Sequence, residues 1–522
     1  MIIDARSVPV GTTIDTEVCI IGAGAAGITI AREFVDAPFR VAVLESGGMD
    51  FDPDIQQLYD GESIGRSFPI LTTSRLRFFG GTTNHWGGWC LPLDPIDFEA
   101  RDDFPYHGWP FTKSDLDPWY RRAQKVCQLG PYDYRPANWG IRPSEIPEPF
   151  AGPDFESEIF QVSAVRFGPV YGPELRGTSR VTVYLYANAF HLDAGENDAE
   201  VRELLVKTLA GSQFTVRARV YVLAAGGIEN ARLLLASGRD DGKGLGNPHD
   251  LVGRFFMVHL LFSGGIIVPS DPHMNFDFQT AGEYGSAGSR HPYGTFIGLS
   301  AAAMLNLRLP SIFMHWTYRL SPVAGSVKAL QRIFHGEGPG GSLLSDLSAV
   351  VGHIDGITSF AARKVLFGEG MPVEALDLSC VSEQQPNPQS RVFLGSRRDA
   401  LGMREIVVDW QLTAGDQSKA AETVRRLGIE IGRTGFGRLR SSFNDGNAWP
   451  PDISGNEHHI GTTRMHHDPA LGVVDGNCRV HSVANLYLAG SSVFPTSGAN
   501  NPTLTIVALA LRLADHLKKL IK

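Results

Sequence analysis

Two stretches of the chain have the hydrophobic pattern of a strand buried on both faces, and both continue through glycine into a helical pattern. Residues 18–21 form the first apolar run, which precedes a helix-like segment and a further apolar run at residues 41–44. Residues 216–236 repeat the order of apolar strand, glycine pair and helix. Short apolar runs that alternate with helical segments are typical of a parallel sheet. The pattern therefore predicts an α/β domain.

The middle of the chain has a different pattern of apolar and polar residues. Residues 131–199 contain many prolines and short alternating runs, and β-like segments separated by turns continue through residues 261–450. Alternation of this kind predicts antiparallel strands. The glycine-rich residues 336–342 are expected to be either a mobile lid or an inert surface loop. The clearest expected elements are strands at 293–299, 390–394 and 405–411, and a helix near 418–431.

The last segment of the chain has helical periodicity. Apolar side chains recur at three- and four-residue steps from Ile506 to Leu520, after the sequence Asn500-Asn501-Pro502-Thr503. Proline suits the first position of a helix, so a long amphipathic helix is expected to begin at Pro502. Asn501 is then a candidate N-cap as well as a candidate functional residue.

A glycine motif follows the first predicted strand directly. Gly22 permits a tight turn, Gly24 lets a pyrophosphate approach the backbone, and Gly27 lets the helix pack on the strand. Glu45 follows the second apolar run, where an acidic side chain can hold ribose hydroxyls. The sequence therefore predicts a dinucleotide site built from Gly22, Gly24, Ala26, Gly27, Glu45 and Ser46.

The second junction of strand, glycine and helix changes the identity of the expected dinucleotide. Ala225 and Gly226 lie at this junction, on what is expected to be the same sheet edge. A long dinucleotide such as FAD needs two such turns, so the pair favours FAD over NAD. We expect a Rossmann-like FAD-binding domain and an α+β substrate-binding domain built on an antiparallel sheet. The expected boundaries are 1–130, 200–260 and 451–522 for the first domain, and 131–199 and 261–450 for the second.

Two glycine pairs bracket aromatic side chains in residues 75–90. Gly80-Gly81 and Gly87-Gly88 enclose His85 and Trp86, so the backbone there can approach a flat ring closely. Two interpretations stay open: an aromatic-rich surface loop, or a loop that lies over a cofactor ring. On the second, the cofactor contacts are Gly81, Thr82, Asn84, His85, Trp86 and Gly87.

Composition excludes several classes of partner. The 522 residues carry a net charge of −9 without a dense Lys/Arg run, which argues against nucleic acid and anionic membrane as partners. No apolar run is long enough to span a membrane, and the amino-terminal sequence lacks an export signal, so a cytoplasmic location is expected. The five cysteines are widely separated and His466-His467-Asp468 only imitates a metal cluster, so no metal is expected.

The carboxyl-terminal segment carries the residues best suited to catalysis. His458-His459-Ile-Gly461-Thr contains two adjacent histidines. Read with the glycine motif and the 216–236 junction, these segments resemble the glucose–methanol–choline (GMC) family of FAD oxidoreductases. The resemblance is greatest to pyranose oxidases, bacterial C-glycoside 3-oxidases and the catalytic subunits of sugar dehydrogenases. It covers both ends of the chain and becomes weak between residues 261 and 450.

The resemblance implies roles for individual residues. The register of the family's motif favours His458 as the catalytic base and leaves the adjacent His459 open, and Asn501 matches the second catalytic position. His85 falls where pyranose oxidases bond the flavin covalently, whereas sugar dehydrogenases resemble this stretch without that bond, and the non-covalent form is favoured. The resemblance also places Gly490, Ser491, Asn501 and Thr503 against the cofactor.

The implied reaction is oxidation of a secondary hydroxyl, at C2 or C3, of a pyranose sugar or glycoside. It proceeds by hydride transfer to flavin N5, with oxygen or a soluble acceptor as the oxidant, and an oligomer is compatible with the sequence. Two alternatives stay open: a dehydrogenase of choline-like or simple alcohols, and a lyase in which FAD is structural.

Overall fold

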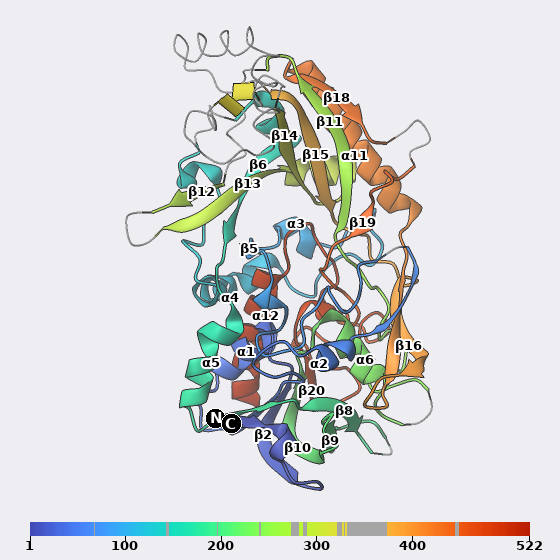
Figure 1. The fold of residues 1–522 in the computed structure, drawn as a ribbon. Coiled ribbons are helices and arrows are strands. Elements are labelled where there is room, and N and C mark those ends of the chain that lie inside the picture. The colour runs from blue at the N-terminus through green and yellow to red at the C-terminus, as the bar shows by residue number, and fades with distance from the viewer. Residues whose placement is uncertain are drawn as a thin grey trace.

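The fold is described from a computed structural model of the chain (Figure 1). The residues that it describes are 1–66, 68–141, 146–195, 197–239, 242–272, 281–285, 290–320, 326–327, 329–330, 373–443 and 448–522. The glycine-rich residues 336–342, expected to form a lid or a surface loop, lie outside these ranges.

The first sheet has eight strands and forms the lower part of the molecule in Figure 1. Its order is β1-β7-β3-β2-β10-β9-β8, with β20 also pairing with β10. The pairings from β1 to β10, and that of β20 with β10, are parallel, whereas β9 pairs antiparallel with both β10 and β8. The strands are β1 (Ile2–Asp4), β2 (Thr13–Ile21), β3 (Val41–Leu44), β7 (Val181–Leu185), β8 (Asn188–Asp193), β9 (Glu203–Lys207), β10 (Gln213–Leu223) and β20 (Leu486–Leu488).

The register of this sheet brings four strand ends together. Ile21 of β2 pairs with Leu44 of β3 and with Leu223 of β10, which in turn pairs with Leu488 of β20. Each strand is almost completely apolar at this end, as the predicted double-sided burial requires. The residues that follow the four strands therefore meet at one edge of the sheet.

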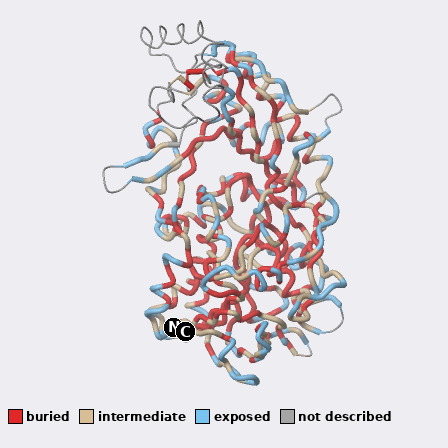
Figure 2. The backbone as a smooth tube through the Cα atoms, in the orientation of Figure 1, coloured by how far each residue is buried: buried red, intermediate tan, exposed pale blue. Residues whose placement is uncertain are grey.

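Helices cover the first sheet and connect its strands. The carboxyl-terminal helix α12 packs against α1 and α4, and its buried apolar residues belong to the core of the first sheet. Buried residues, red in Figure 2, fill the interior of the molecule. The helices are α1 (Ala25–Arg32), α2 (Pro53–Gln57), α3 (Pro95–Phe98), α4 (Lys113–Val126), α5 (Phe167–Gly177), α6 (Gly226–Leu235), α7 (Ala301–Leu307), α11 (Ala414–Arg433) and α12 (Thr503–Leu520).

A second, nine-stranded sheet lies at the other end of the molecule, with α11 beside it (Figure 1). Its order is β18-β11-β15-β14-β13-β6-β5, and all its pairings are antiparallel. Its strands are β5 (Trp89–Cys90), β6 (Phe155–Val162), β11 (Leu260–Pro269), β12 (Ala281–Tyr284), β13 (His291–Leu299), β14 (Ile312–Leu320), β15 (Val373–Ser382), β18 (Gly437–Ser441) and β19 (Ser454–Gly455).

Two sequence expectations need correction. Residues 181–193 were expected in the substrate domain, but β7 pairs between β1 and β3 in the first sheet, and β8 reaches the same sheet through β9. The strands predicted at 390–394 and 405–411 become β16 (Arg391–Arg398) and β17 (Arg404–Trp410), which form a separate sheet with β4 (Gly61–Gly65). Both differences arise because strand pairing is set by partners far away in the sequence.

Gly27 is fixed by the contact between α1 and the turn before it. A Cβ atom at this position would lie 1.9 Å from the backbone oxygen of Gly22. We expect Gly27→Ala to lower the free energy of unfolding by about 1–3 kcal/mol, because the helix has to move away from the strand. Chemical or thermal unfolding measures the change.

Gly432 provides the matched control for this substitution. It lies in α11, and a Cβ atom there meets nothing within 4 Å. Alanine is the better helix former, so Gly432→Ala should leave stability unchanged or raise it. Equal stability of the two variants would contradict the close-packing role of Gly27.

Candidate active site

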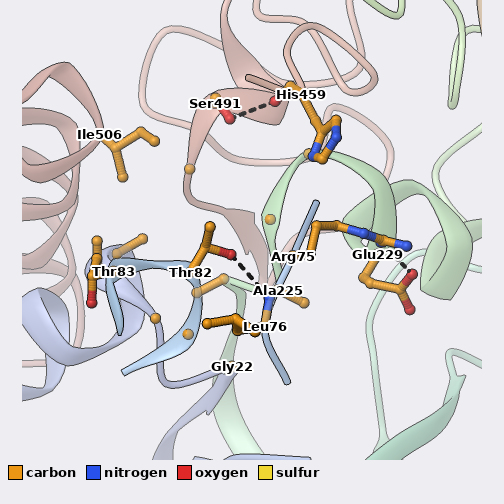
Figure 3. A pocket seen from close by; sticks show the side chains of 18 of the residues that line it. Gly22, Arg75, Leu76, Thr82, Thr83, Ala225, Glu229, His459, Ser491 and Ile506 are labelled. Carbon is orange, nitrogen blue, oxygen red and sulfur yellow. Dashed lines mark hydrogen bonds and ion pairs between the residues drawn. The ribbon is translucent and has the colours of Figure 1, made fainter. Parts of the chain in front are cut away.

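A long cavity opens at the edge of the first sheet where the four strands end (Figure 3). It begins near Glu45 and Ser46 and extends to His458 and Asn501, so it connects the predicted dinucleotide motif with the predicted catalytic pair. The sequence-predicted residues that line it are Gly22, Gly24, Ala26, Glu45, Ser46, Gly81, Thr82, His85, Trp86, Gly87, Ala225, Gly226, His458, Gly490, Ser491, Asn501 and Thr503.

Two predicted contact residues do not line this cavity. Gly27 faces the backbone of Gly22 and serves packing, as its glycine role implied. The side chain of Asn84 turns away and donates a hydrogen bond to the carbonyl oxygen of Phe79 at 3.1 Å. Asn84 therefore stabilises the fold of its own loop.

Three helices point uncapped amino termini at the cavity. The N-cap residues are Gly24 for α1, Ala225 for α6 and Pro502 for α12, and none has a side-chain capping bond. By contrast, Thr112 and Thr413 cap α4 and α11 through their side chains. Free N–H groups and the positive end of a helix dipole attract anions. This edge of the sheet can therefore bind phosphate and other anionic groups.

The backbone is also open toward the cavity at three glycines. A Cβ atom at Gly24, Gly226 or Gly490 would meet no other atom within 4 Å, and the latter two glycines have left-handed φ angles of 91° and 101°. A ligand can therefore approach the main chain at these positions without obstruction. Asn501 is not the N-cap of α12, because Pro502 takes that position, and the side chain of Asn501 has no hydrogen bond among the described residues.

Glu45 holds the turn that carries the glycine motif. Its two carboxylate oxygens accept hydrogen bonds from the backbone N–H groups of Ala23 and Gly47, at 2.9 Å and 3.0 Å. Burial raises the pKa of this carboxyl, although these backbone donors act in the opposite direction. Glu45 lines the cavity, where the sequence predicts a contact with the ribose. Its two hydrogen bonds also hold together the loops that follow β2 and β3.

A buried ionic cluster that the sequence did not predict forms one wall. Arg75 pairs with Glu229 at 2.8 Å (Figure 3). Arg77 and Arg232 approach the same carboxylate at 3.5 Å and 3.3 Å. Burial alone would raise the pKa of Glu229, but the three guanidinium groups lower it to about 2. The cluster leaves a net positive wall beside the helix termini. In the sequence, the acidic Glu229 within the largely apolar segment of α6 was the signal that could have indicated a buried ionic cluster.

The loop with two glycine pairs lines the cavity, as its interpretation as a loop over a cofactor ring requires. Trp86 is held by a hydrogen bond from Nε1 to the carbonyl oxygen of Val165, at 2.8 Å. Trp89 also lines the cavity and is 36% exposed. Its ring stacks on Phe160 and Phe313, with centroids 4.3 Å and 5.7 Å apart.

His458 and His459 both line the cavity but differ in their surroundings. The Nδ1 atom of His458 lies 2.9 Å from Asn456 Nδ2 and 3.0 Å from His259 Nδ1, while Nε2 has no hydrogen bond among the described residues. The ring of His459 is buried between Phe68 and Phe256. His458 therefore has a nitrogen available to a substrate and fixed partners on the other nitrogen.

Both histidines and their neighbour His259 are neutral at physiological pH. Burial, followed by the nearby His259 and His459, lowers the pKa of His458 well below its usual value. Burial lowers the pKa of His259 to about 4 and that of His459 to about 3. A neutral imidazole is the form that can accept a proton.

Within the described ranges, no cluster of three or more His, Cys, Asp or Glu side chains is placed to hold a metal ion. His466 instead uses Nδ1 to accept the backbone N–H of Asp468, at 2.9 Å. The helices of the described residues include none suited to crossing a membrane.

The sequence is similar to known proteins, either over part of the chain or over nearly all of it. Residues 386–510 match the family model of the GMC oxidoreductases. The 6'''-hydroxyparomomycin C oxidase of Streptomyces lividus is 27% identical, over 96% of this chain and 92% of the relative. The C-glycoside 3-oxidase of Arthrobacter globiformis is 34% identical over 145 residues, which cover 27% of this chain and 26% of the relative.

A solved structure shares the fold over almost the whole length. Pyridoxine 4-oxidase from Mesorbium loti superposes with a TM-score of 0.56 at 18% sequence identity. The alignment covers 96% of this chain and 98% of that protein. The arrangement of a Rossmann-like domain and a second sheet is therefore that of a known fold.

The Glu229 cluster gives a prediction about stability. Glu229→Gln leaves the guanidinium groups of Arg75, Arg77 and Arg232 without their shared carboxylate, so we expect unfolding to become easier by about 3–5 kcal/mol. The wild-type pKa of about 2 lies below the unfolded value, so this stabilisation is complete above pH 4.5 and is lost as the pH falls toward 2. Thermal unfolding as a function of pH measures both effects.

Glu422→Gln is the matched control, because Glu422 pairs with Arg425 and Arg426 on the outer face of α11. A surface ion pair contributes little, so the melting temperature should stay close to that of the wild type. If Glu229→Gln is as stable as this control, the cluster does not brace the cavity wall.

Proposed function

We propose that the chain is a GMC oxidoreductase that binds FAD in the cavity and oxidises a secondary hydroxyl, at C2 or C3, of a pyranose sugar or glycoside. One observation carries the proposal: a single cavity is lined both by three uncapped helix termini and by His458 and Asn501. The first feature suits a dinucleotide, and the second suits proton removal from an alcohol.

The residues of the cavity fit FAD. Gly24, Gly226 and Gly490 leave the space that a pyrophosphate and a ring system need beside the main chain. Glu45, Ser46, His85 and Trp86 all line the cavity. We assign the first two to the ribose and the loop with the other two to the flavin ring. We propose non-covalent binding, although His85 matches the histidine that pyranose oxidases bond to the flavin.

The chain's own residues handle the proton. FAD, when bound, supplies the acceptor for the hydride. His458 is neutral and offers Nε2 to the substrate hydroxyl, whose proton it accepts as the C–H bond breaks. Asn501 lines the same end and donates a hydrogen bond from its amide to the same oxygen. General-base assistance of this kind contributes about a hundred- to ten-thousand-fold.

A sugar substrate is supported by the relatives and by one side chain. The relatives named above are a hydroxyparomomycin C oxidase and a C-glycoside oxidase. Trp89 presents an aromatic ring to the cavity and is held flat from behind by Phe160 and Phe313. Such a ring can stack on the C–H face of a pyranose. Oxygen or a soluble acceptor would complete the cycle.

Substitution of the base tests the proposal. We expect His458→Ala to retain FAD and to reduce it with sugar about a hundred- to ten-thousand-fold more slowly, because the hydroxyl proton loses its acceptor. Anaerobic stopped-flow absorbance measures the rate. Near-normal reduction by this variant would show that His458 is not the base.

Two further histidine variants locate the effect. His467→Ala removes an exposed imidazole from the same segment and should reduce FAD at the wild-type rate. His459→Phe keeps an aromatic ring beside Phe68 and Phe256, and we expect it to retain most activity. A loss confined to His459→Phe would assign the base to His459 instead.

The surroundings of His458 also predict the pH dependence. Because its pKa lies well below 6.5, the imidazole stays neutral and able to accept a proton in mildly acidic solution. The rate of flavin reduction should therefore be constant from about pH 8 to about pH 6, and fall only at lower pH. Half-maximal reduction near pH 6.5 would indicate an unperturbed imidazole and contradict the buried base.

A further inference from the structure

The Nδ1 atom of His458 lies between two side chains that favour different positions of its proton. Asn456 Nδ2 is 2.9 Å away and His259 Nδ1 is 3.0 Å away. A neutral imidazole carries one ring proton, on Nδ1 or on Nε2. Only the form with the proton on Nδ1 leaves Nε2 free to act as a base, so these two neighbours control the chemistry.

Asn456 favours the inactive form. The backbone N–H of His458 donates to Asn456 Oδ1 at 3.0 Å, which fixes the orientation of the amide. Its Nδ2 group therefore faces His458 and can only donate a hydrogen bond. An Nδ1 atom that accepts this bond carries no proton, and the proton of His458 would then occupy Nε2.

His259 favours the active form. Its side chain is completely buried, and Nε2 lies 3.4 Å from the carbonyl oxygen of Ser497, which can only accept a hydrogen bond. The single proton of neutral His259 is therefore directed to Nε2, and its Nδ1 becomes an acceptor for the Nδ1–H of His458. The chain of bonds runs from His458 through His259 to the main chain.

We propose that His259 is a positioning residue that keeps the proton of His458 on Nδ1 and so leaves Nε2 unprotonated toward the substrate. The inference rests on the proposed function, in which His458 is the base. His259 acts only through His458, in the way that the buried carboxylate of a catalytic triad fixes the tautomer of its histidine. It does not line the cavity.

The first pair of variants separates an acceptor from a packing role. His259→Asn places an amide oxygen near the position of Nδ1, whereas His259→Leu fills similar space without an acceptor. We expect His259→Leu to bind FAD and sugar as the wild type does, but to reduce flavin at least a hundredfold more slowly. His259→Asn should stay within about tenfold of the wild type, since it can still accept the proton of His458.

A double variant tests the opposing role of Asn456. In His259→Leu, Asn456 alone contacts His458 Nδ1 and holds the proton on Nε2. Removing its side chain as well, in His259→Leu/Asn456→Ala, releases that restraint, so flavin reduction should recover at least tenfold over His259→Leu. A purely structural role for His259 predicts the opposite, because a second truncation would only loosen the site further.

Anaerobic stopped-flow reduction of the holoenzyme by one active sugar, over a range of concentrations, measures rate and affinity separately for all four proteins and for His458→Ala. Slow reduction by His259→Leu with unchanged sugar affinity, and recovery in the other two variants, establishes the role. Wild-type rates in His259→Leu, equal losses in both His259 variants, or no recovery in the double variant each overturn it. If His458→Ala is itself unimpaired, the proposed function fails instead.

Discussion

The parallel register at one edge of the first sheet is the constraint on which the rest of the structure depends. Ile21, Leu44, Leu223 and Leu488 end their strands at the same level, although they come from distant parts of the chain. Each strand then turns away into a loop or helix. Because carboxyl ends of parallel strands share one edge, this register alone gathers the dinucleotide motif, the second glycine junction and Gly490 around one cavity.

Stability and function are balanced at this edge. Free helix termini and a buried arginine cluster are costly features in a folded protein, since polar groups without partners lose their hydration. Here Glu229 stabilises the arginines, and Glu45 satisfies the backbone donors of the first two loops. The remaining helix termini stay free toward the cavity, where an anionic cofactor would supply the missing partners.

The local elements of the fold were largely predictable from the sequence. The strand, glycine turn and helix around Gly24, the junction at Gly226 and the helix after Pro502 each depend on residues close together in the chain, and the structure contains all three. The cavity lining followed from them, because strand ends determine where their loops meet. The roles assigned to His458 and Asn501 remain proposals.

The pairing of strands that lie far apart in the sequence was not predicted. The position of β7 in the first sheet, and the sheet of β16, β17 and β4, depend on partners that no local pattern specifies. The same applies to side chains that meet only in three dimensions. Arg75 and Glu229 are 154 residues apart, and His259 and His458 are 199 residues apart. His259 stands inside an apolar run and Glu229 inside a largely apolar helix, but neither signal identifies the partner.

The most direct test of the account is the visible spectrum of the purified protein under anaerobic conditions, during titration with free sugars, glycosides, choline and simple alcohols. The account predicts a flavin absorption band that one of the pyranosides bleaches, and a product whose NMR spectrum places the new carbonyl group at C2 or C3. A protein without flavin, a flavin that no sugar bleaches, or bleaching only by choline or simple alcohols would contradict it.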